Sequence, residues 1–511
     1  MDRLKAYRLK AYRGLYLSFG ETVDAEVNRR LHALTARLLE RPLAGVTDLV
    51  PGYTRLYCEY DEARLSAAAV RDWLEAQRDG LEETPPRAAK RVDIPVRYDG
   101  EDLPDIAART GLSVEEVIAR HAGRSYRVYA IGFTPGLPFM GEVDPALRLP
   151  RRSVPRPRVP ANTVAMAGAQ TGVYPMASPG GWNLLGQALV RLYDPQRQSP
   201  FLLEPGDEVR FYPAEGETPL DFEPLELLPP DPRHPLLRVQ GPGLLDLVVD
   251  AGRFMAGRFG LSRSGPLDAR SAGLANRLVG NPPEAPLLEL NLSGARFEAL
   301  DEGVVAFAGW GMRPLLNGRE APAFESFALR RGDRLGFKPV TRGSRGYLAL
   351  AGGLDSGQFM NSASVDLKGK IGRPLREGDI LGMASLRSPR PGFGFRPYAW
   401  LGDPLPLRLL PGPQASAEAL AALLRAAFTV TRADRMGVHL GGPPVPGGDV
   451  LSEPTPLGAV QVTSGGVPIL LLNDRGTLGG YSKPAIIHPG DLPRVAQLRP
   501  GERLRFVALA R

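Results

Sequence analysis

The chain has 511 residues, of which 43% are hydrophobic and 23% charged, a composition typical of a folded protein with several domains. Its net charge of +7 comes almost wholly from arginines interleaved with Asp and Glu, so we expect no nucleic-acid partner and favour a small acidic ligand. The single cysteine, Cys58, excludes a disulfide framework, and no metal site is expected. The sequence lacks a signal-peptide core and a membrane-length apolar run, which predicts a cytoplasmic protein without membrane contact.

Residues 1–98 predict a ferredoxin-like domain, because the order of their elements is βαββαβ. Thr22 or Asp24 can cap the first helix, and apolar residues then recur on one helix face. Asp61 is expected to cap the second helix. The predicted elements are a strand at Leu9–Phe19, a helix to Glu40, strands at Val46–Leu49 and Leu56–Tyr60, a helix to Arg78, and a strand at Val92–Tyr98.

Residues 99–225 predict two short helices followed by a β-barrel. The helices are Asp105–Thr110 and Ser113–His121, and the second opens with a capping-box sequence. From Tyr126 to Gly186 the chain is dense in Gly and Pro, which indicates shaped loops at strand ends, where binding sites are commonly built. The alternative is a set of barrel turns that bind nothing.

Two internal repeats support the β prediction. Tight Gly-acid turns lead into strand-like runs at Gly206, Gly332, Gly378 and Gly501. In addition, Val159–Gly186 is similar to Pro456–Tyr481, since both have a small-residue loop, a Val-containing strand and a Gly-Gly-aromatic turn. We therefore expect the two halves to contribute equivalent loops to one composite cleft.

The second half begins after a Pro-rich linker at 226–235 and occupies 236–511 as one or more β-barrel domains. Helices are predicted at Asp268–Leu278 and Ser416–Ala427, and a division of this half is expected near 388–397. The fold class is therefore mainly β with α+β: a ferredoxin-like domain followed by barrels.

Common self-contained catalytic motifs are missing from the sequence. It has no phosphate loop, nucleophile elbow, HExxH helix or dinucleotide-binding glycine motif, and no biotin-attachment lysine flanked by Met. This pattern indicates either one component of a larger enzyme or an interaction protein.

The motifs resemble two families. Gly132–Phe139, Pro157–Pro160, Ala167–Pro175 and Ser178–Trp182, with His121 before them, resemble subunit 1 of the allophanate hydrolase family. Asp250–Arg253, Ser264–Asp268, Ala275–Asn281, Leu288-Glu289 and Gly479–Tyr481 resemble subunit 2. Val249 stands where the subunit-2 pattern commonly has Gln.

These families are similar to the B and C components of prokaryotic 5-oxoprolinase, here fused in one chain. The resemblance implies cyclophilin-like barrels and the ATP-dependent cleavage of 5-oxo-L-proline to L-glutamate, with Mg²⁺ accompanying the ATP and a separate A component without which the chain is inactive. Two alternatives stay open: a carboxyltransferase-like component acting on a urea-type amide, and a regulatory protein that binds a histidine kinase. The ATP site cannot be placed from the sequence, and whether the chain forms a homo-oligomer is open.

The chemistry of such a reaction suggests the roles of candidate residues. A lactam with a carboxylate needs an anion clamp, amide-directed hydrogen bonds and a general base. The candidates for the clamp are Arg156, Arg158 or Arg253. His121 or His488 is a candidate to move protons, and Asp474 with Lys483 is a candidate acid–base pair. The alternatives are that His121 only ends a helix and that Asp474 only lies in a turn. The candidate substrate-binding residues are Phe133, Arg156, Arg158, Gln170, Thr171, Tyr174, Gly180, Gly181, Trp182, Arg253, Ser264, Asp268, Gly479, Gly480 and Tyr481.

Overall fold

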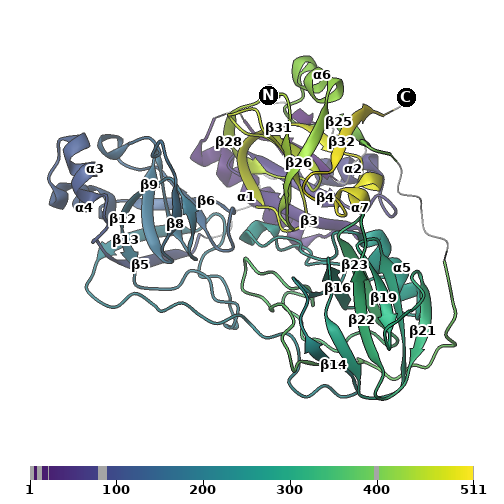
Figure 1. The fold of residues 1–511 in the computed structure, drawn as a ribbon. Coiled ribbons are helices and arrows are strands. Elements are labelled where there is room, and N and C mark those ends of the chain that lie inside the picture. The colour runs from purple at the N-terminus through teal and green to yellow at the C-terminus, as the bar shows by residue number, and fades with distance from the viewer. Residues whose placement is uncertain (1–4, 8–13, 21, 79–88, 396–401, 510–511) are drawn as a thin grey trace.

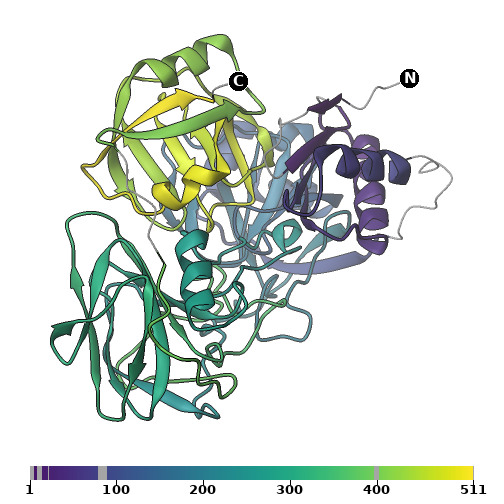
Figure 2. The same ribbon diagram turned by 90° about the vertical axis from the view of Figure 1, so that its right-hand side faces the viewer.

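A computed structural model describes residues 5–7, 14–20, 22–78, 89–395 and 402–509. The fold is mainly β, as the sequence predicts, and has four parts in chain order (Figure 1). A small α/β unit is followed by a first barrel, a two-sheet middle unit and a second barrel. Figure 2 shows the second barrel above the middle unit, with the N-terminal unit beside them.

The N-terminal unit is a four-stranded antiparallel sheet with two helices. Asp24 caps the first helix by accepting hydrogen bonds from the backbone of Glu26 and Val27, and this helix buries Leu31, Leu34 and Leu38. The strands, in sheet order, are β1 (Lys5–Tyr7), β2 (Gly14–Ser18), β4 (Arg55–Tyr60) and β3 (Val46–Pro51), and the helices are α1 (Ala25–Glu40) and α2 (Ala67–Arg78).

Two predictions for this unit are wrong. The helix expected to start at Asp61 starts at Ala67 instead, because the Ser66 hydroxyl accepts the cap hydrogen bond from Ala69 N while Asp61 closes an earlier turn. The strand expected to complete the ferredoxin-like sheet, observed as β5 (Arg91–Arg97), lies in the first barrel, and β1 occupies the sheet edge next to β2. The part of the expected strand Leu9–Phe19 that covers residues 9–13 lies outside the described residues.

The first barrel is closed by seven strands. Its first strand, β5, pairs in parallel with its last, β13, and antiparallel with β12. Two helices precede the next strand, α3 (Leu103–Thr110) and α4 (Val114–Ala122), and the predicted capping box between Ser113 and Glu116 is present. The remaining strands of the ring are β6 (Ser125–Ile131), β7 (Pro138–Gly141), β9 (Thr163–Ala167), β10 (Gln170–Tyr174), β12 (Asn183–Ala188) and β13 (Glu208–Pro213).

A small hairpin of β8 (Arg156–Val159) and β11 (Ser178–Gly180) stands beside this ring, and a short 3₁₀ helix, η2 (Pro145–Leu147), follows β7. The barrel interior is filled by apolar side chains from every strand of the ring. The interior of the ring is therefore a packed core.

The second barrel repeats the connectivity of the first. Its strands follow the order β25-β32-β26-β27-β30-β29-β31, the pairing of β25 with β31 closes the ring, and β28 adds to β31. As in the first barrel, the first strand pairs in parallel with the last. The elements are β25 (Leu405–Pro411), α6 (Ala417–Arg425), β26 (Ala427–Ala433), β27 (Gly437–Gly441), β28 (Asp449–Pro454), β29 (Ala459–Val462), β30 (Pro468–Leu471), β31 (Leu478–Ile487), η4 (Pro489–Asp491), α7 (Leu492–Val495) and β32 (Arg503–Ala508).

This equivalence explains the sequence repeat. The first copy, Val159–Gly186, carries β9, β10 and the start of β12, and the second, Pro456–Tyr481, carries β29, β30 and the start of β31. These strands hold matching places in the two rings. The repeat therefore reflects two topologically equivalent barrels.

The middle unit stacks two sheets around the largest apolar core of the described chain. Its helix, α5 (Ala269–Leu278), confirms the helix predicted at Asp268–Leu278, with Asp268 in the cap position. One sheet contains β14 (Pro235–Gly241), β17 (Arg296–Ala299), β19 (Met312–Leu316), β20 (Arg319–Glu320), β22 (Arg334–Pro339) and β24 (Ile380–Gly382). The other contains β15 (Leu247–Val249), β16 (Leu287–Asn291), β18 (Gly303–Gly309), β21 (Glu325–Leu329) and β23 (Arg345–Leu350), with η3 (Gly257–Phe259) and α5 (Ala269–Leu278) nearby.

The predicted Gly-acid turns are all present. Gly206, Gly332, Gly378 and Gly501 have φ between 87° and 95°, and each precedes a strand by two residues. The expected linker is not a free spacer, because Leu227 is buried and its carbonyl accepts a hydrogen bond from Gly357 N. Near the expected division at 388–397, Gly394 pairs with Glu325, and residues 396–401 lie outside the described residues. None of the helices that the structure describes is long and apolar enough to span a bilayer.

Candidate active site

A cleft of about 850 Å³ lies between loops of the two barrels. One wall comes from β10 and the Gly-Gly-Trp loop of the first barrel, and the other from β28 and the β30–β31 turn of the second. The walls approach closely at Gly132, where a side chain would overlap Leu478 of the opposite barrel. The composite cleft expected from the sequence repeat is therefore present.

The cleft brings together nine of the residues predicted to bind substrate, and their binding role stays a prediction. They share one feature, which is a place in the cleft lining, on strands β10, β11 and β31 or on the loops beside them. They are Phe133, Gln170, Tyr174, Gly180, Gly181, Trp182, Gly479, Gly480 and Tyr481.

Aromatic rings form the first barrel's wall. The Trp182 ring centroid lies 5.9 Å from that of Phe139 and 6.3 Å from that of Tyr174. Burial raises the pKa of Tyr174 to about 12, so its hydroxyl stays protonated and can donate a hydrogen bond. Gly180 lies so close to this hydroxyl that a Cβ there would overlap it. The aromatic part of this wall thus has one phenolic donor, held against a glycine.

The cleft has more basic than acidic side chains. Its lining includes Arg151, Arg152, Lys368 and Arg475, whereas Asp449 is the one carboxylate among its described lining residues. Arg152 Nη1 pairs with Asp102 at 2.9 Å, so its charge is compensated, but the other three cations make no ion pair with any residue that the structure describes. This excess of positive charge favours an anionic ligand.

Lys368 was not predicted from the sequence. Its ammonium donates a hydrogen bond to the carbonyl of Phe133 and lies 5.1 Å from the centroid of that residue's ring. Burial lowers the pKa of Lys368 to about 8, against the opposing charges of Asp366 and Asp474. The residue lies in an irregular segment of the middle unit between β23 and β24, where no local pattern indicates that it reaches the first barrel.

His121 and Thr171 lie inside the first barrel, away from the cleft lining. Thr171 donates its hydroxyl proton to Ala165 O at 3.1 Å, so it accepts from His121 Nε2 at 2.9 Å. His121 Nδ1 then accepts from the Tyr98 hydroxyl at 2.8 Å, and the imidazole stacks on Phe211. Burial lowers the pKa of His121 to about 3, so the ring is neutral at pH 7.

The predicted Asp474–Lys483 pair does not form, because each residue has another partner. Asp474 Oδ2 lies 2.7 Å from Nε of Arg435, which also contacts Glu289. Lys483 Nζ lies 2.9 Å from Glu453 Oε1. Burial raises the pKa of Asp474 and lowers that of Lys483, and the adjacent opposite charge counteracts each shift. Both groups are parts of buried ionic clusters.

The three arginines predicted to clamp an anion also lie outside the cleft lining. Arg156 binds Glu101 at 2.6 Å and Asp102 at 2.7 Å, and exposed Arg158 is not in the lining. Arg253 is buried and donates to the carbonyls of Phe359 and Ser364.

The other second-half candidates have structural contacts. Asp268 accepts from Ser271 at the cap of α5, and the carbonyl of Ser264 accepts from Asn473 at 2.8 Å. His488 Nδ1 accepts from Gly490 N at the start of η4. None of these three lines the cleft.

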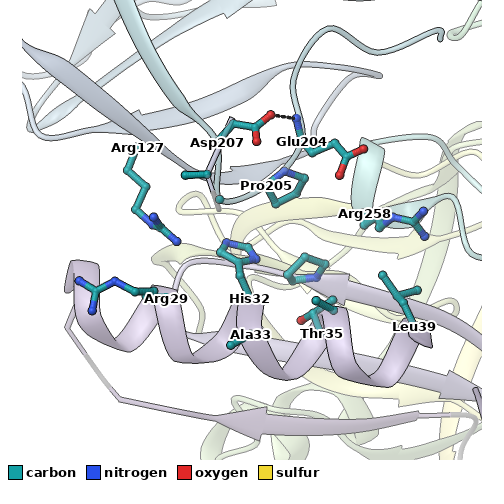
Figure 3. Close-up of a pocket in the computed structure, with 14 residues that line it drawn as sticks. Arg29, His32, Ala33, Thr35, Leu39, Arg127, Glu204, Pro205, Asp207 and Arg258 are labelled. Carbon is teal, nitrogen blue, oxygen red and sulfur yellow. Dashed lines mark hydrogen bonds between the residues drawn. The ribbon is translucent and has the colours of Figure 1, made fainter. Parts of the chain in front are cut away.

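A second, small cavity of about 80 Å³ lies where α1 meets the first barrel (Figure 3). His32 projects from α1 toward Pro205, and its Nε2 lies 2.9 Å from Tyr129 O. Burial lowers the pKa of His32 to about 4, so this imidazole is also neutral at pH 7. The cavity marks a packed junction between units.

Across the described residues, no group of three or more His, Cys, Asp or Glu is placed to hold a metal ion.

Comparisons with known proteins match both halves of the chain. Residues 6–203 match the family model for carboxyltransferase domain, subdomain C and D, and residues 259–508 match that for subdomain A and B. The chain is 38% identical over 210 residues to the B component of 5-oxoprolinase from Bacillus subtilis, a match that covers 39% of this chain and 88% of that protein. It is 34% identical over 287 residues to the C component of 5-oxoprolinase from Escherichia coli, which covers 53% of this chain and 91% of that protein.

One solved structure matches nearly the whole chain. The crystal structure of TTHA0988 is 56% identical and covers 97% of this chain and 99% of that one, with a TM-score of 0.93. The two halves and their arrangement therefore recur together in another single polypeptide.

Proposed function

Because the chain belongs to the carboxyltransferase-domain family that includes the B and C components of 5-oxoprolinase, we propose that it is a fused form of these two components. In this proposal it acts in the cytoplasm with a separate A-like protein and uses ATP to cleave 5-oxo-L-proline to L-glutamate. The observation that carries the proposal is the cleft between the two barrels, whose lining has more cations than carboxylates. A lactam that bears a carboxylate matches this lining in charge.

The cleft also has groups that suit an amide. The half-buried side chain of Gln170 and the protonated hydroxyl of Tyr174 lie on the same wall, and both can hydrogen-bond to a lactam. ATP would activate the amide oxygen as a phosphate ester, after which water opens the ring to give glutamate and phosphate. The unpaired cations of the cleft suit the charge that develops on the phosphorylated substrate.

The direct test is glutamate release by the purified chain from 5-oxo-L-proline and ATP, with and without the A-like protein. We expect glutamate and ADP in equal amounts only when both proteins are present. No ATP-dependent glutamate under either condition would contradict the proposal.

A second candidate rests on the family models, whose descriptions name a carboxyltransferase domain. Carboxyl transfer to a urea-type amide would need a carboxybiotin carrier on another chain. Incubation with a biotin carboxylase, its biotinylated carrier, bicarbonate and urea tests this candidate. Formation of carboxylated urea without any activity on 5-oxo-L-proline would favour carboxyl transfer over the cleavage of 5-oxo-L-proline. The regulation of a histidine kinase stays a prediction from sequence alone.

A further inference from the structure

Arg475 is a buried cation at the cleft that has no carboxylate partner. It lies in the turn between β30 and β31 and is 9% exposed. Its Nε donates to Thr455 O at 2.7 Å and its Nη1 to Leu472 O at 3.5 Å, which fixes the plane of the guanidinium. Nη2 makes no hydrogen bond with any residue that the structure describes.

Burying the guanidinium of Arg475 without a nearby anion is energetically unfavourable. Removing a guanidinium from water is unfavourable unless an opposite charge compensates it. Two other buried cations of the same barrel have such a charge, since Arg435 pairs with Asp474 and Lys483 with Glu453. Arg475 hydrogen-bonds only to neutral carbonyls and lines the cleft; it also borders a small cavity with Asp48 and Glu59 but forms an ion pair with neither. The missing counter-ion is therefore expected to come from a ligand.

Lys368 supplies a second cation in the same region. Its ammonium donates to the carbonyl of Phe133. The same carbonyl lies 3.6 Å from the position that a Cβ would take at Gly476, next to Arg475 in the chain. The middle unit and the second barrel thus bring two cations, neither in an ion pair with a described residue, to one loop of the first barrel.

We propose that Arg475 and Lys368 form the carboxylate-binding end of the cleft and receive the carboxylate of a small monoanionic substrate. This inference rests on the proposed function for the identity of that substrate. It replaces the clamp expected at Arg156, Arg158 or Arg253, all three outside the cleft lining. With the carboxylate held there, the lactam ring is free to face the wall formed by Gln170 and Tyr174.

The test is direct binding to the full chain without ATP or partner, measured by calorimetry or ligand-observed NMR. The probes are 5-oxo-L-proline, its neutral carboxamide and glutarate. The variants are Arg475→Gln and Lys368→Gln, with Arg475→Lys to keep the charge and Arg330→Gln as an exposed control outside the cleft. Melting temperatures show whether each variant is folded.

We expect each Gln variant to weaken binding of 5-oxo-L-proline about tenfold to a hundredfold, the range for one charged hydrogen-bonding group. The carboxamide should bind all variants equally, Arg475→Lys should lose less affinity than Arg475→Gln, and Arg330→Gln should match the wild type. Unchanged affinity for 5-oxo-L-proline in both Gln variants would overturn the carboxylate site, as would a wild-type chain that binds none of the carboxylates. If the wild type binds glutarate in an Arg475-dependent manner but not 5-oxo-L-proline, the carboxylate site stands and the proposed function fails.

Discussion

Arg55 Nη1 of the N-terminal sheet lies 2.5 Å from Glu453 Oε2 of the second barrel. Glu453 also pairs with Lys483 and accepts from Gln414 Nε2 at 2.7 Å. One buried carboxylate thus binds cations from elements at opposite ends of the chain. This cluster borders a chamber of about 300 Å³ that shares Val450, Leu451 and Ser452 with the main cleft.

Replacing Glu453 by Gln should destabilise the protein strongly. The change leaves Lys483, which is fully buried, without a carboxylate, and losing one partner of a buried ion pair costs about 3 kcal/mol. Denaturant unfolding measures the effect. The control is Glu298→Gln, which removes an exposed pair with Arg238 and should cost less than about 1 kcal/mol. Equal effects of the two variants would show that the buried cluster adds no stability.

Gly180→Ala should impair ligand binding far more than Gly181→Ala. A Cβ at Gly180 overlaps the Tyr174 hydroxyl, whereas at Gly181 the nearest atoms are 3.7 Å away. The first change must displace the aromatic wall, so we expect about a tenfold or greater loss of affinity, of the size seen when a well-placed hydrogen-bonding group is lost. Titration of 5-oxo-L-proline against both variants measures it. The two neighbouring glycines should differ, and equal affinities would argue against a role for this wall.

Ligand binding should weaken as the pH rises through about 8. Lys368 is charged below its pKa of about 8 and neutral above it, so its attraction for a carboxylate is present at pH 7 and lost at pH 9. Dissociation constants for 5-oxo-L-proline between pH 6 and pH 10 show this directly. In Lys368→Arg the charge persists over the whole range, so the decline should disappear. A decline that is the same in both proteins would have another origin.

Stability should fall on acidification, partly through His121. The pKa of His121 is about 3 in the folded protein and about 6.5 in an unfolded chain, so the unfolded state binds more protons between these values. This contribution to stability is complete above pH 6.5 and is lost as the pH falls toward 3, by up to about 1.4 kcal/mol per pH unit. Melting temperatures of the wild type and His121→Gln from pH 7 to pH 4.5 measure it, and the variant should have the shallower dependence.

Features that depend on neighbouring residues were predictable from the sequence. The caps predicted at Asp24 and Ser113 are confirmed, because a cap is formed by a side chain and backbone groups within a few residues, although the cap predicted at Asp61 is formed by Ser66 instead. The repeat also placed two loop sets at one cleft, since equivalent barrels present equivalent loops.

Features that depend on pairing across the fold were not predictable. The β5 segment has the pattern of a strand, but its sequence does not state whether it joins the N-terminal sheet or the barrel. In the same way, Asp474 and Lys483 suit each other chemically, yet Arg435 and Glu453 lie closer. Lys368 and Arg475 become candidates only when the fold shows which cations lack a carboxylate.

Both walls of the cleft belong to one polypeptide, joined through the middle unit. Bringing them together is therefore a unimolecular event, governed by an effective concentration that the fold sets. Dilution cannot separate the walls, and neither can be made in excess of the other. The binding constant of the cleft should accordingly be independent of protein concentration.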